Sequence, residues 1–384
     1  MNQSSGPHAS VAFAPGRLNL IGEHIDYHGL SVLPMALERG VRIRFTPRDD
    51  GRIVVANSNP AFAPLDFPMG PELVPGSPGE WGNYVKAAAL LAWERFGCRS
   101  GIDAHVAANL PPASGLSSSS ALVVAVSLAL LHRNDVPIPF LELAEAAAEG
   151  ERFVGTAGGG MDQAASLLGR QGHAVRIGFE PLSARAVSIP GGWSFLVAHS
   201  GVEAAKSGGA REAYNLRRSE TTRGLAEVAD RLGLAGASPW DLLATQPSEA
   251  LFETAATLEP PRAAWVRHVL SEARRVDEAE GAMVARDLEA FGHWLTASHT
   301  SLRDDYQVSH PRLDRLVDAA LEAGAAGARL TGAGFGGCML AVCDEKRLPS
   351  VRLALAGALE RNGSGVAAEP FEARAGAGAF VGTG

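Results

Sequence analysis

One segment near residue 120 constrains the fold more than any other part of the chain. Residues 117–132 read SSSSALVVAVSLALLH, and their apolar side chains would lie on almost every side of a helix. Such a helix must be covered on most sides, so other elements have to surround it. The run is too short to span a bilayer. With 384 residues, the chain is long enough to build these layers in two domains.

The residues before this helix indicate an anion site. Two prolines in the sequence PPASGL (111–116) stop the preceding segment, and Gly115 permits a tight turn. The serines then lie in the first helical turn, where backbone N–H groups lack partners and the helix dipole is positive. Two interpretations remain open here, a serine helix cap and a phosphate-binding loop. The loop is not a Walker A motif, because no Gly-Lys-Ser/Thr follows.

A second segment, near the N-terminus, is dense in polar groups. Residues 16–29 read GRLNLIGEHIDYHG and include Arg17, Glu23, His24 and Asp26. A polyhydroxylated ligand needs a hydrogen-bond partner for each hydroxyl, and carboxylates supply several acceptors. The segment therefore predicts a site for a sugar-like ligand. We expect His24 to hydrogen-bond this ligand rather than to bind a metal.

Two glycine-rich blocks lie further along the chain. The first contains Gly158, Gly159 and Gly160 and is followed by Asp162, and three successive glycines indicate a close backbone approach. From position alone, Asp162 is also a candidate helix cap, and Glu151 a solvated helix charge. The second block reads GAGFGG (332–337), which by itself is weak evidence for any function.

These segments together resemble the galactokinases, a branch of the GHMP small-molecule kinases. The sugar-site segment, the serine loop and both glycine blocks occur in the family's order, and the resemblance covers residues 11–382. It implies an α+β fold of two domains, here 1–195 and 196–384, with the N-terminal domain resembling domain 2 of ribosomal protein S5. ATP and sugar are then expected in the cleft between the domains.

The resemblance also implies roles for single residues. Asp162 would be the general base, and Arg17 would either keep it ionised or stabilise charge on the transferring phosphoryl group. The implied sugar-binding residues are Arg17, Glu23, His24, Asp26, Gly159, Asp162 and Tyr214. The implied nucleotide-binding residues are Trp81, Tyr84, Gly115, Leu116, Ser117, Ser118, Ser119 and Gly334, with Ser119 and Glu151 on Mg²⁺. Trp81 has the alternative role of a core tryptophan.

The expected reaction is phosphorylation of α-D-galactose by ATP, with Mg²⁺, at the anomeric hydroxyl. Ile25 stands where common bacterial galactokinases have threonine. The three glycines 158–160, the four serines and residues 202–206 are more similar to the eukaryotic branch, which includes N-acetylgalactosamine kinase. A kinase for galactosamine derivatives is therefore the alternative enzyme. A third possibility is a non-catalytic sugar sensor of the same family, but such a sensor has lost a Ser-Ala pair that is present here as Ser120–Ala121.

Composition limits the remaining possibilities. The net charge of −8 argues against nucleic acid as a partner. Cys98, Cys338 and Cys343 lack metal-ligand spacing and predict reduced thiols, and residues 1–10 lack the features of a signal peptide. We therefore expect a cytoplasmic, monomeric protein with no membrane contact. The patterns predict strands at 41–45, 51–58, 195–199 and on both sides of 332–337, helices at 83–96, 117–132 and 140–154, and a loop at 59–80.

Overall fold

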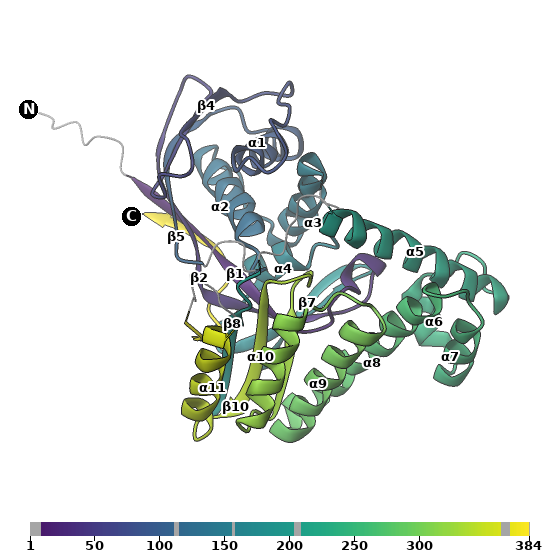
Figure 1. Ribbon diagram of the computed structural model, residues 1–384. Helices are drawn as coiled ribbons and strands as arrows, with labels where there is room; N and C mark the ends of the chain where they lie inside the picture. The colour runs from purple at the N-terminus through teal and green to yellow at the C-terminus, as the bar shows by residue number, and fades with distance from the viewer. Residues whose placement is uncertain (1–8, 111–114, 156–157, 203–208, 362–368, 384) are drawn as a thin grey trace, which may run out of the picture.

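The architecture is α+β, as predicted, with two main sheets, a separate hairpin and helices packed against them (Figure 1). The computed structural model describes residues 9–110, 115–155, 158–202, 209–361 and 369–383. Strands and helices do not alternate regularly along the chain, which distinguishes this fold from a doubly wound α/β domain.

The first sheet has six strands in the order β12-β1-β2-β5-β3-β4. Its strands are β1 (Ser10–Ile21), β2 (Leu33–Pro47), β3 (Arg52–Asn57), β4 (Leu65–Pro68), β5 (Ile102–Ala108) and β12 (Phe380–Thr383). In β2, buried Val41, Ile43 and Phe45 alternate with exposed arginines, which confirms the predicted half-buried strand. The predicted loop at 59–80 is wrong at β4, which pairs with β3 and buries Phe67.

Helix α2 forms the centre of the layer that covers this sheet. The helices and turns of this part are η1 (Asp26–His28), α1 (Gly82–Phe96), α2 (Ser118–Arg133), α3 (Phe140–Gly150), η2 (Glu151–Val154) and α4 (Met161–Leu168). Every residue of α2 from Ser120 to Leu131 is buried, because β1, β2 and α1 pack around it. This burial confirms the expectation for an all-apolar helix. The helix predicted at 140–154 ends at Gly150 and gives way to the 3₁₀ turn η2.

The second sheet is antiparallel, with the strand order β11-β8-β10-β9. Its strands are β8 (Trp193–His199), β9 (Gly327–Thr331), β10 (Cys338–Asp344) and β11 (Phe371–Ala373), and β6 (His173–Phe179) and β7 (Leu182–Ser188) form the hairpin. Phe195 and Val197 of β8 belong to the larger apolar core, whereas Leu196 and Ala198 belong to a second core. Burial on both faces explains why β8 reads as a continuous apolar run.

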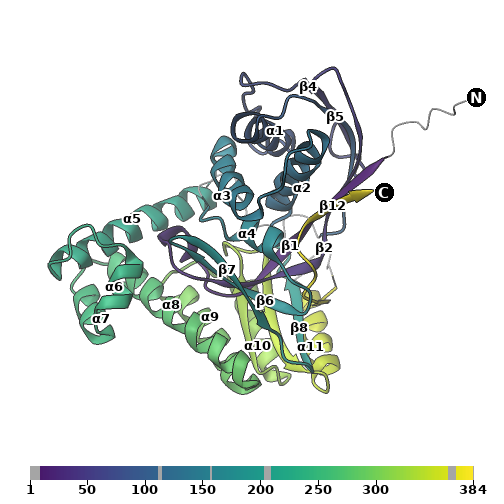
Figure 2. The same ribbon diagram turned by 180° about the vertical axis from the view of Figure 1, so that it is seen from behind.

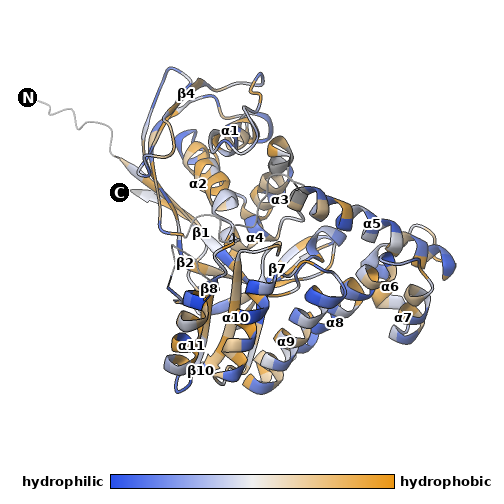
Figure 3. Ribbon diagram, viewed as in Figure 1, coloured by the Kyte–Doolittle hydropathy of each residue, from blue (hydrophilic) through white to orange (hydrophobic). Residues whose placement is uncertain are grey.

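The remaining helices follow β8 or β10 along the chain. They are α5 (Gly209–Arg231), α6 (Pro239–Thr245), α7 (Ser248–Ala256), α8 (Arg262–Ala285), α9 (Leu288–Asp304), α10 (Pro311–Glu322) and α11 (Leu348–Arg361). Helices α10 and α11 lie side by side against the second sheet, and α5, α6 and α7 extend to one side of the molecule (Figure 1). Hydrophobic residues concentrate on α2 and β10, whereas α5 and α8 carry long hydrophilic stretches (Figure 3).

The two sheets are connected in two ways. The chain returns at its C-terminal end to the first sheet, where β12 pairs with β1 (Figure 2). The rings of Phe13 and Phe380 lie 5.6 Å apart. The end of β9 contacts the end of β1, where Thr331 Oγ1 donates a hydrogen bond of 3.1 Å to the carbonyl oxygen of Asn19. The division at residues 195 and 196 stays a prediction. The contact between β9 and β1 brings several of the predicted site segments together.

Two simpler predictions concern the cysteines and the membrane. All three cysteines belong to the described part of the chain, where they are buried and unpaired. Among the helices in the described ranges, none combines the length and the apolar character needed to cross a bilayer.

Candidate active site

The sugar-site segment leaves β1 through a turn with two left-handed residues. Gly22 has φ +104° and His24 has φ +65°. Glycine adopts this conformation without strain, whereas a histidine in it is uncommon and needs support from its surroundings. The turn directs the Glu23 side chain toward β9 and the His24 ring toward α5. Neighbouring residues of the chain thus reach different walls of the site.

Both predicted catalytic residues are in direct contact. Arg17 of β1 donates from Nε to Asp162 Oδ1 at 2.8 Å, and its Nη2 lies 2.8 Å from the same oxygen. The Nη1 group of Arg17 donates to the carbonyl oxygen of Gly115 at 2.5 Å. One buried guanidinium therefore joins the carboxylate to the backbone of the serine loop. Asp162 is the second residue of α4, after the cap residue Gly160, so the helix-cap interpretation of Asp162 is wrong.

The serine loop turns toward Asp162. Ser117 occupies the cap position of α2 with φ +60°, yet its side chain makes no capping hydrogen bond. Its hydroxyl donates to Asp162 Oδ2 instead, and Ser120 Oγ approaches the same oxygen at 3.4 Å. The backbone of Leu116 is fixed from the other side, because its carbonyl oxygen accepts from the Arg17 amide at 3.2 Å. The side chain of Ser117 therefore does not act as a helix cap.

Ser118 and Ser119 form the first turn of α2. The prolines and the two residues after them, 111–114, lie outside the described residues. The predicted phosphate-binding residues, Gly115 to Ser119, all belong to the described part of the chain. The loop that they form has a backbone held by Arg17 and lies next to a carboxylate.

The glycine block between β9 and β10 lies against this loop. A side chain at Gly332, which has φ +86°, would come within 3.2 Å of the Gly115 carbonyl oxygen. Gly334, with φ +78°, packs instead against the Val308 backbone, where a Cβ would come within 2.2 Å of the carbonyl oxygen. Close backbone approach explains both glycines. The expected proximity of Gly334 to the ligand stays a prediction.

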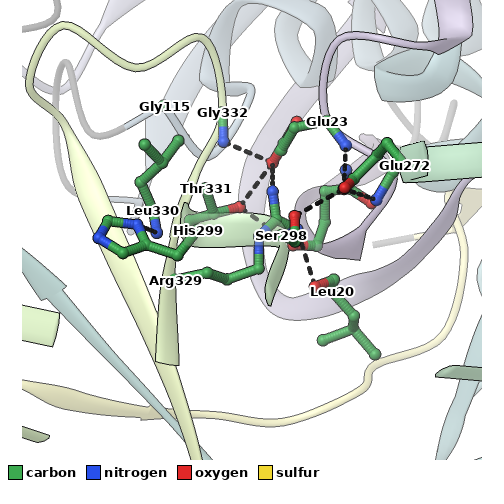
Figure 4. Close-up of polar contacts among 12 residues, drawn as sticks. Leu20, Glu23, Gly115, Glu272, Ser298, His299, Arg329, Leu330, Thr331 and Gly332 are labelled. Carbon is green, nitrogen blue, oxygen red and sulfur yellow. Dashed lines mark hydrogen bonds and ion pairs between the residues drawn. The ribbon is translucent and has the colours of Figure 1, made fainter. Parts of the chain in front are cut away.

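Glu23 is held by the strand that precedes this glycine block (Figure 4). Its Oε1 accepts from Gly332 N at 2.7 Å and from Thr331 Oγ1 at 3.1 Å. The Arg329 guanidinium lies 3.4 Å from the same oxygen. Glu23 is only 3% exposed. All three contacts involve Oε1, and they connect the sugar-site segment with the glycine block that follows β9.

Asp26 and Gly159 meet at the other side of the site. A Cβ on Gly159 would lie 2.4 Å from the carbonyl carbon of Asp26 and 2.5 Å from its Oδ2, which explains the need for glycine there. Burial raises the pKa of Asp26 to about 7, and the nearby negative charges of Asp162 and Glu23 add to this effect. The backbone amides of Tyr27 and Met161 oppose it. The three acidic residues therefore belong to one electrostatic unit.

An aromatic cluster surrounds His24. The ring of Tyr214 from α5 lies 5.5 Å from the His24 ring and 5.7 Å from the Tyr27 ring. His24 Nδ1 hydrogen-bonds the Tyr27 hydroxyl at 2.8 Å, which contacts the Tyr306 hydroxyl at 3.0 Å. Burial lowers the pKa of His24 to about 3, so the imidazole is neutral at physiological pH. The structure thus brings Tyr214 to the predicted sugar residues.

The predicted adenine residues lie at the start of α1. Trp81 is partly exposed, donates from Nε1 to the Ala63 carbonyl oxygen at 3.1 Å and lies 5.7 Å from the Phe62 ring. Tyr84 is half-buried against the larger core. Trp81 packs against the same core but is only partly buried. The adenine role of both residues stays a prediction.

The predicted magnesium residues can be tested only in part. Glu151 is the first residue of η2, and its side chain lies outside the part of the chain that the structure describes. The described residues contain no group of three or more histidine, cysteine, aspartate or glutamate side chains that could hold a metal. Magnesium in kinase sites needs only one or two carboxylates together with substrate phosphates. Serine hydroxyls in the first turn of α2, beside the Asp162 carboxylate, fit this oxygen-donor chemistry.

Several buried polar residues surround the turn, and those of α8 were not predicted from the sequence. Glu272, His268 and Arg275 come from α8, Ser298 from α9 and Arg329 from β9. Glu272 is completely buried and accepts hydrogen bonds from the amides of Gly22 and Glu23 (Figure 4). Glu272 lies in a stretch rich in charged residues (SEARRVDEAEG, 271–281), and no local pattern separates it from its exposed neighbours.

Three family models match the chain. The galactokinase galactose-binding signature matches residues 2–47, the GHMP kinases N terminal domain residues 83–170 and the GHMP kinases C terminal domain residues 279–361. The order of the three agrees with that of the motifs described above.

Solved structures show the same relationship. The galactokinase of Lactococcus lactis, solved in complex with galactose, is 30% identical, with a TM-score of 0.87 over 97% of this chain and 95% of that one. The mevalonate kinase of Methanococcus jannaschii is 19% identical, with a TM-score of 0.67 over 97% of this chain and 99% of that one. The homoserine kinase of Cytophaga hutchinsonii is 16% identical, with a TM-score of 0.57 over 100% of this chain and 97% of that one.

The last two similarities concern the fold alone, whereas the first extends to sequence along nearly the whole chain. With three matching family models, a contact between Arg17 and Asp162 and a serine loop beside them, the chain belongs to the GHMP kinase family, as a sugar kinase with the galactokinase galactose-binding signature.

Proposed function

We propose that the protein transfers the γ-phosphoryl group of ATP to the anomeric hydroxyl of D-galactose. The products are galactose 1-phosphate and ADP. The observation that carries this proposal is the position of the Asp162 carboxylate. It is bound by Arg17, accepts a hydrogen bond from Ser117 of the serine loop, and its charge contributes to the raised pKa of Asp26. A general base for this reaction must lie within hydrogen-bond reach of the anomeric hydroxyl of the sugar, at the place where this oxygen meets the γ-phosphate.

The bond changes are those of phosphoryl transfer. The anomeric oxygen attacks the γ-phosphorus, Asp162 accepts its proton, and the bond to the bridging oxygen breaks to release ADP. Arg17 forms a salt bridge with Asp162 and would supply positive charge close to the transferring group. Since such reactions depend mostly on positioning and electrostatics, contacts to Asp162 from both β1 and α2 support this role.

The sugar-binding role is proposed for the residues around Asp26. Carboxylates accept hydrogen bonds from sugar hydroxyls, and a neutral His24 can either donate or accept one. The Tyr214 ring would offer an apolar face to the carbon skeleton of the sugar. The backbone of Gly159, which has no side chain and lies close to Asp26, would contact the sugar. Glu23 has one oxygen bound to β9, so its proposed sugar contact uses the other.

The nucleotide would bind along α2. Residues Gly115 to Ser119 would contact the phosphates of ATP, and Trp81 with Tyr84 would lie against the adenine. Ser119 and Glu151 would hold Mg²⁺, which when bound neutralises charge on the phosphates.

A coupled assay of ADP release tests the proposal. We would supply Mg-ATP with galactose, N-acetylgalactosamine, galactosamine, glucose or arabinose, and use Asp162→Asn as the matched inactive control. Preferential turnover of galactose supports the proposal. Preferential turnover of the acetamido sugar overturns it in favour of a galactosamine-type kinase, and sugar binding without any turnover would identify a sensor.

A further inference from the structure

One buried side chain of α8, Glu272, binds two backbone amides in the turn of the sugar-site segment. Glu272 Oε1 accepts from Gly22 N at 3.0 Å and from Glu23 N at 3.3 Å (Figure 4). The same helix, α8, supplies His268, whose Nε2 lies 3.1 Å from the Glu23 carbonyl oxygen. The backbone of Glu23 is therefore held at both its amide and its carbonyl group by α8.

The turn needs such a partner because of its conformation. Gly22 and His24 both have a left-handed backbone conformation. The amides of Gly22 and Glu23 therefore do not take part in regular strand pairing and need another acceptor. A buried amide without a partner is costly, and a carboxylate that accepts two amides removes that cost and fixes their direction. The direction of Glu23 and His24 into the site follows from this arrangement.

Glu272 is itself fixed by charged and polar neighbours. Its Oε2 accepts from Arg275 Nε at 2.7 Å, and its Oε1 accepts from Ser298 Oγ at 2.7 Å. Burial alone would raise its pKa, but the positive charge of Arg275 and other nearby cations lowers the pKa to about 2. The carboxylate is therefore ionised at any pH at which an enzyme of this kind is assayed.

We propose that Glu272 is a positioning residue for the sugar: it fixes the Gly22–His24 turn and thereby sets sugar affinity. It acts through the backbone of the turn, while the serine loop and nucleotide residues lie on other elements. The inference rests on the proposed sugar kinase function. It predicts a selective effect, in which the KM for sugar changes and the KM for ATP does not.

The test compares two glutamates of one helix. Glu272→Gln places an amide NH₂ opposite a donor, either Arg275 or the turn, and we expect the galactose KM to rise about tenfold. The matched control is Glu280→Gln, since Glu280 lies on α8, is paired with Arg176 and Arg185 and makes no contact with the turn. We expect this control to change the galactose KM by less than about twofold, whatever it does to the melting temperature.

A milder variant covers the case in which Glu272→Gln fails to fold. Ser298→Ala removes one hydrogen bond to Glu272 and keeps the carboxylate, so we expect a smaller rise in galactose KM in the same direction. Equal rises in the KM for galactose and for ATP overturn the proposal, as does a galactose KM that stays at the control value. Absence of galactose turnover in the unmodified protein would instead refute the proposed function, and direct calorimetric binding of galactose to the three variants then decides the positioning role.

Discussion

Asp26→Asn should stabilise the ligand-free protein while it weakens sugar binding. The Asp26 carboxylate is partly buried beside Asp162 and Glu23, and its pKa rises from the usual 3.8 to about 7. Its negative charge is therefore less stable in the folded protein than in the unfolded chain. Asparagine has nearly the same shape and cannot ionise.

The sign of the effect follows from proton linkage. Because the pKa of Asp26 is raised in the folded state, the protonated carboxyl contributes stability to the folded protein. This contribution is complete below pH 3.8 and is lost as the pH rises through about 7. The full rise corresponds to about 4 kcal/mol, and solvent screening at this partly exposed side chain reduces it to about 2 kcal/mol. Between pH 5 and pH 8, the stability of Asp26→Asn relative to the unmodified protein should increase by about 0.6 kcal/mol with this screening and by about 2.6 kcal/mol without it.

Urea unfolding of both proteins at pH 5 and pH 8, followed by circular dichroism without sugar, measures this difference. Titrating groups that do not interact with Asp26 contribute equally in both proteins and cancel in the comparison. A stability difference that is the same at both pH values would refute the electrostatic reasoning. The same variant should bind galactose more weakly, because an amide oxygen is a poorer acceptor for sugar hydroxyls than a carboxylate.

Three further variants test single residues of the site. Asp162→Asn should keep sugar binding and lower kcat about a hundredfold or more, and turnover like that of the unmodified protein would remove Asp162 from the base role. Glu23→Gln should raise the sugar KM more than the ATP KM, whereas equal losses would make Glu23 purely structural. Gly159→Ala places a Cβ 2.4 Å from the Asp26 backbone, so calorimetry should show weaker galactose binding and a lower melting temperature, and unchanged values of both would contradict this geometry.

Local patterns predicted much of the fold. The alternation in β2, the apolar run of α2 and the glycine turns are properties of neighbouring residues, and the structure contains them nearly where they were expected. The first strand was not predicted as a strand, because its polar residues, Arg17 and Asn19 among them, indicated a binding segment. The segment is both a strand and part of the candidate binding site, because β1 ends at Ile21, directly before the turn that carries Glu23.

The support of the site could not be predicted in the same way. Glu272 and Arg329 are charged residues that become completely buried, and their burial depends on contacts between β1, α8, α9 and β9. The pKa of Asp26 likewise depends on Asp162, from a distant part of the chain. Pairing between such segments leaves no periodic signal in sequence. A single sequence therefore shows the residues that face a ligand better than those that hold them in place.

The pairing of β12 with β1 has a consequence for synthesis on the ribosome. Every other described strand and helix leaves the ribosome before β12. Until then the outer edge of β1 has no strand partner in this sheet, and such an edge is open to pairing with other chains. The nascent protein thus carries Arg17 and Asp162 before β12 covers the outer edge of β1, and that edge stays open to pairing with other chains until β12 has paired with it.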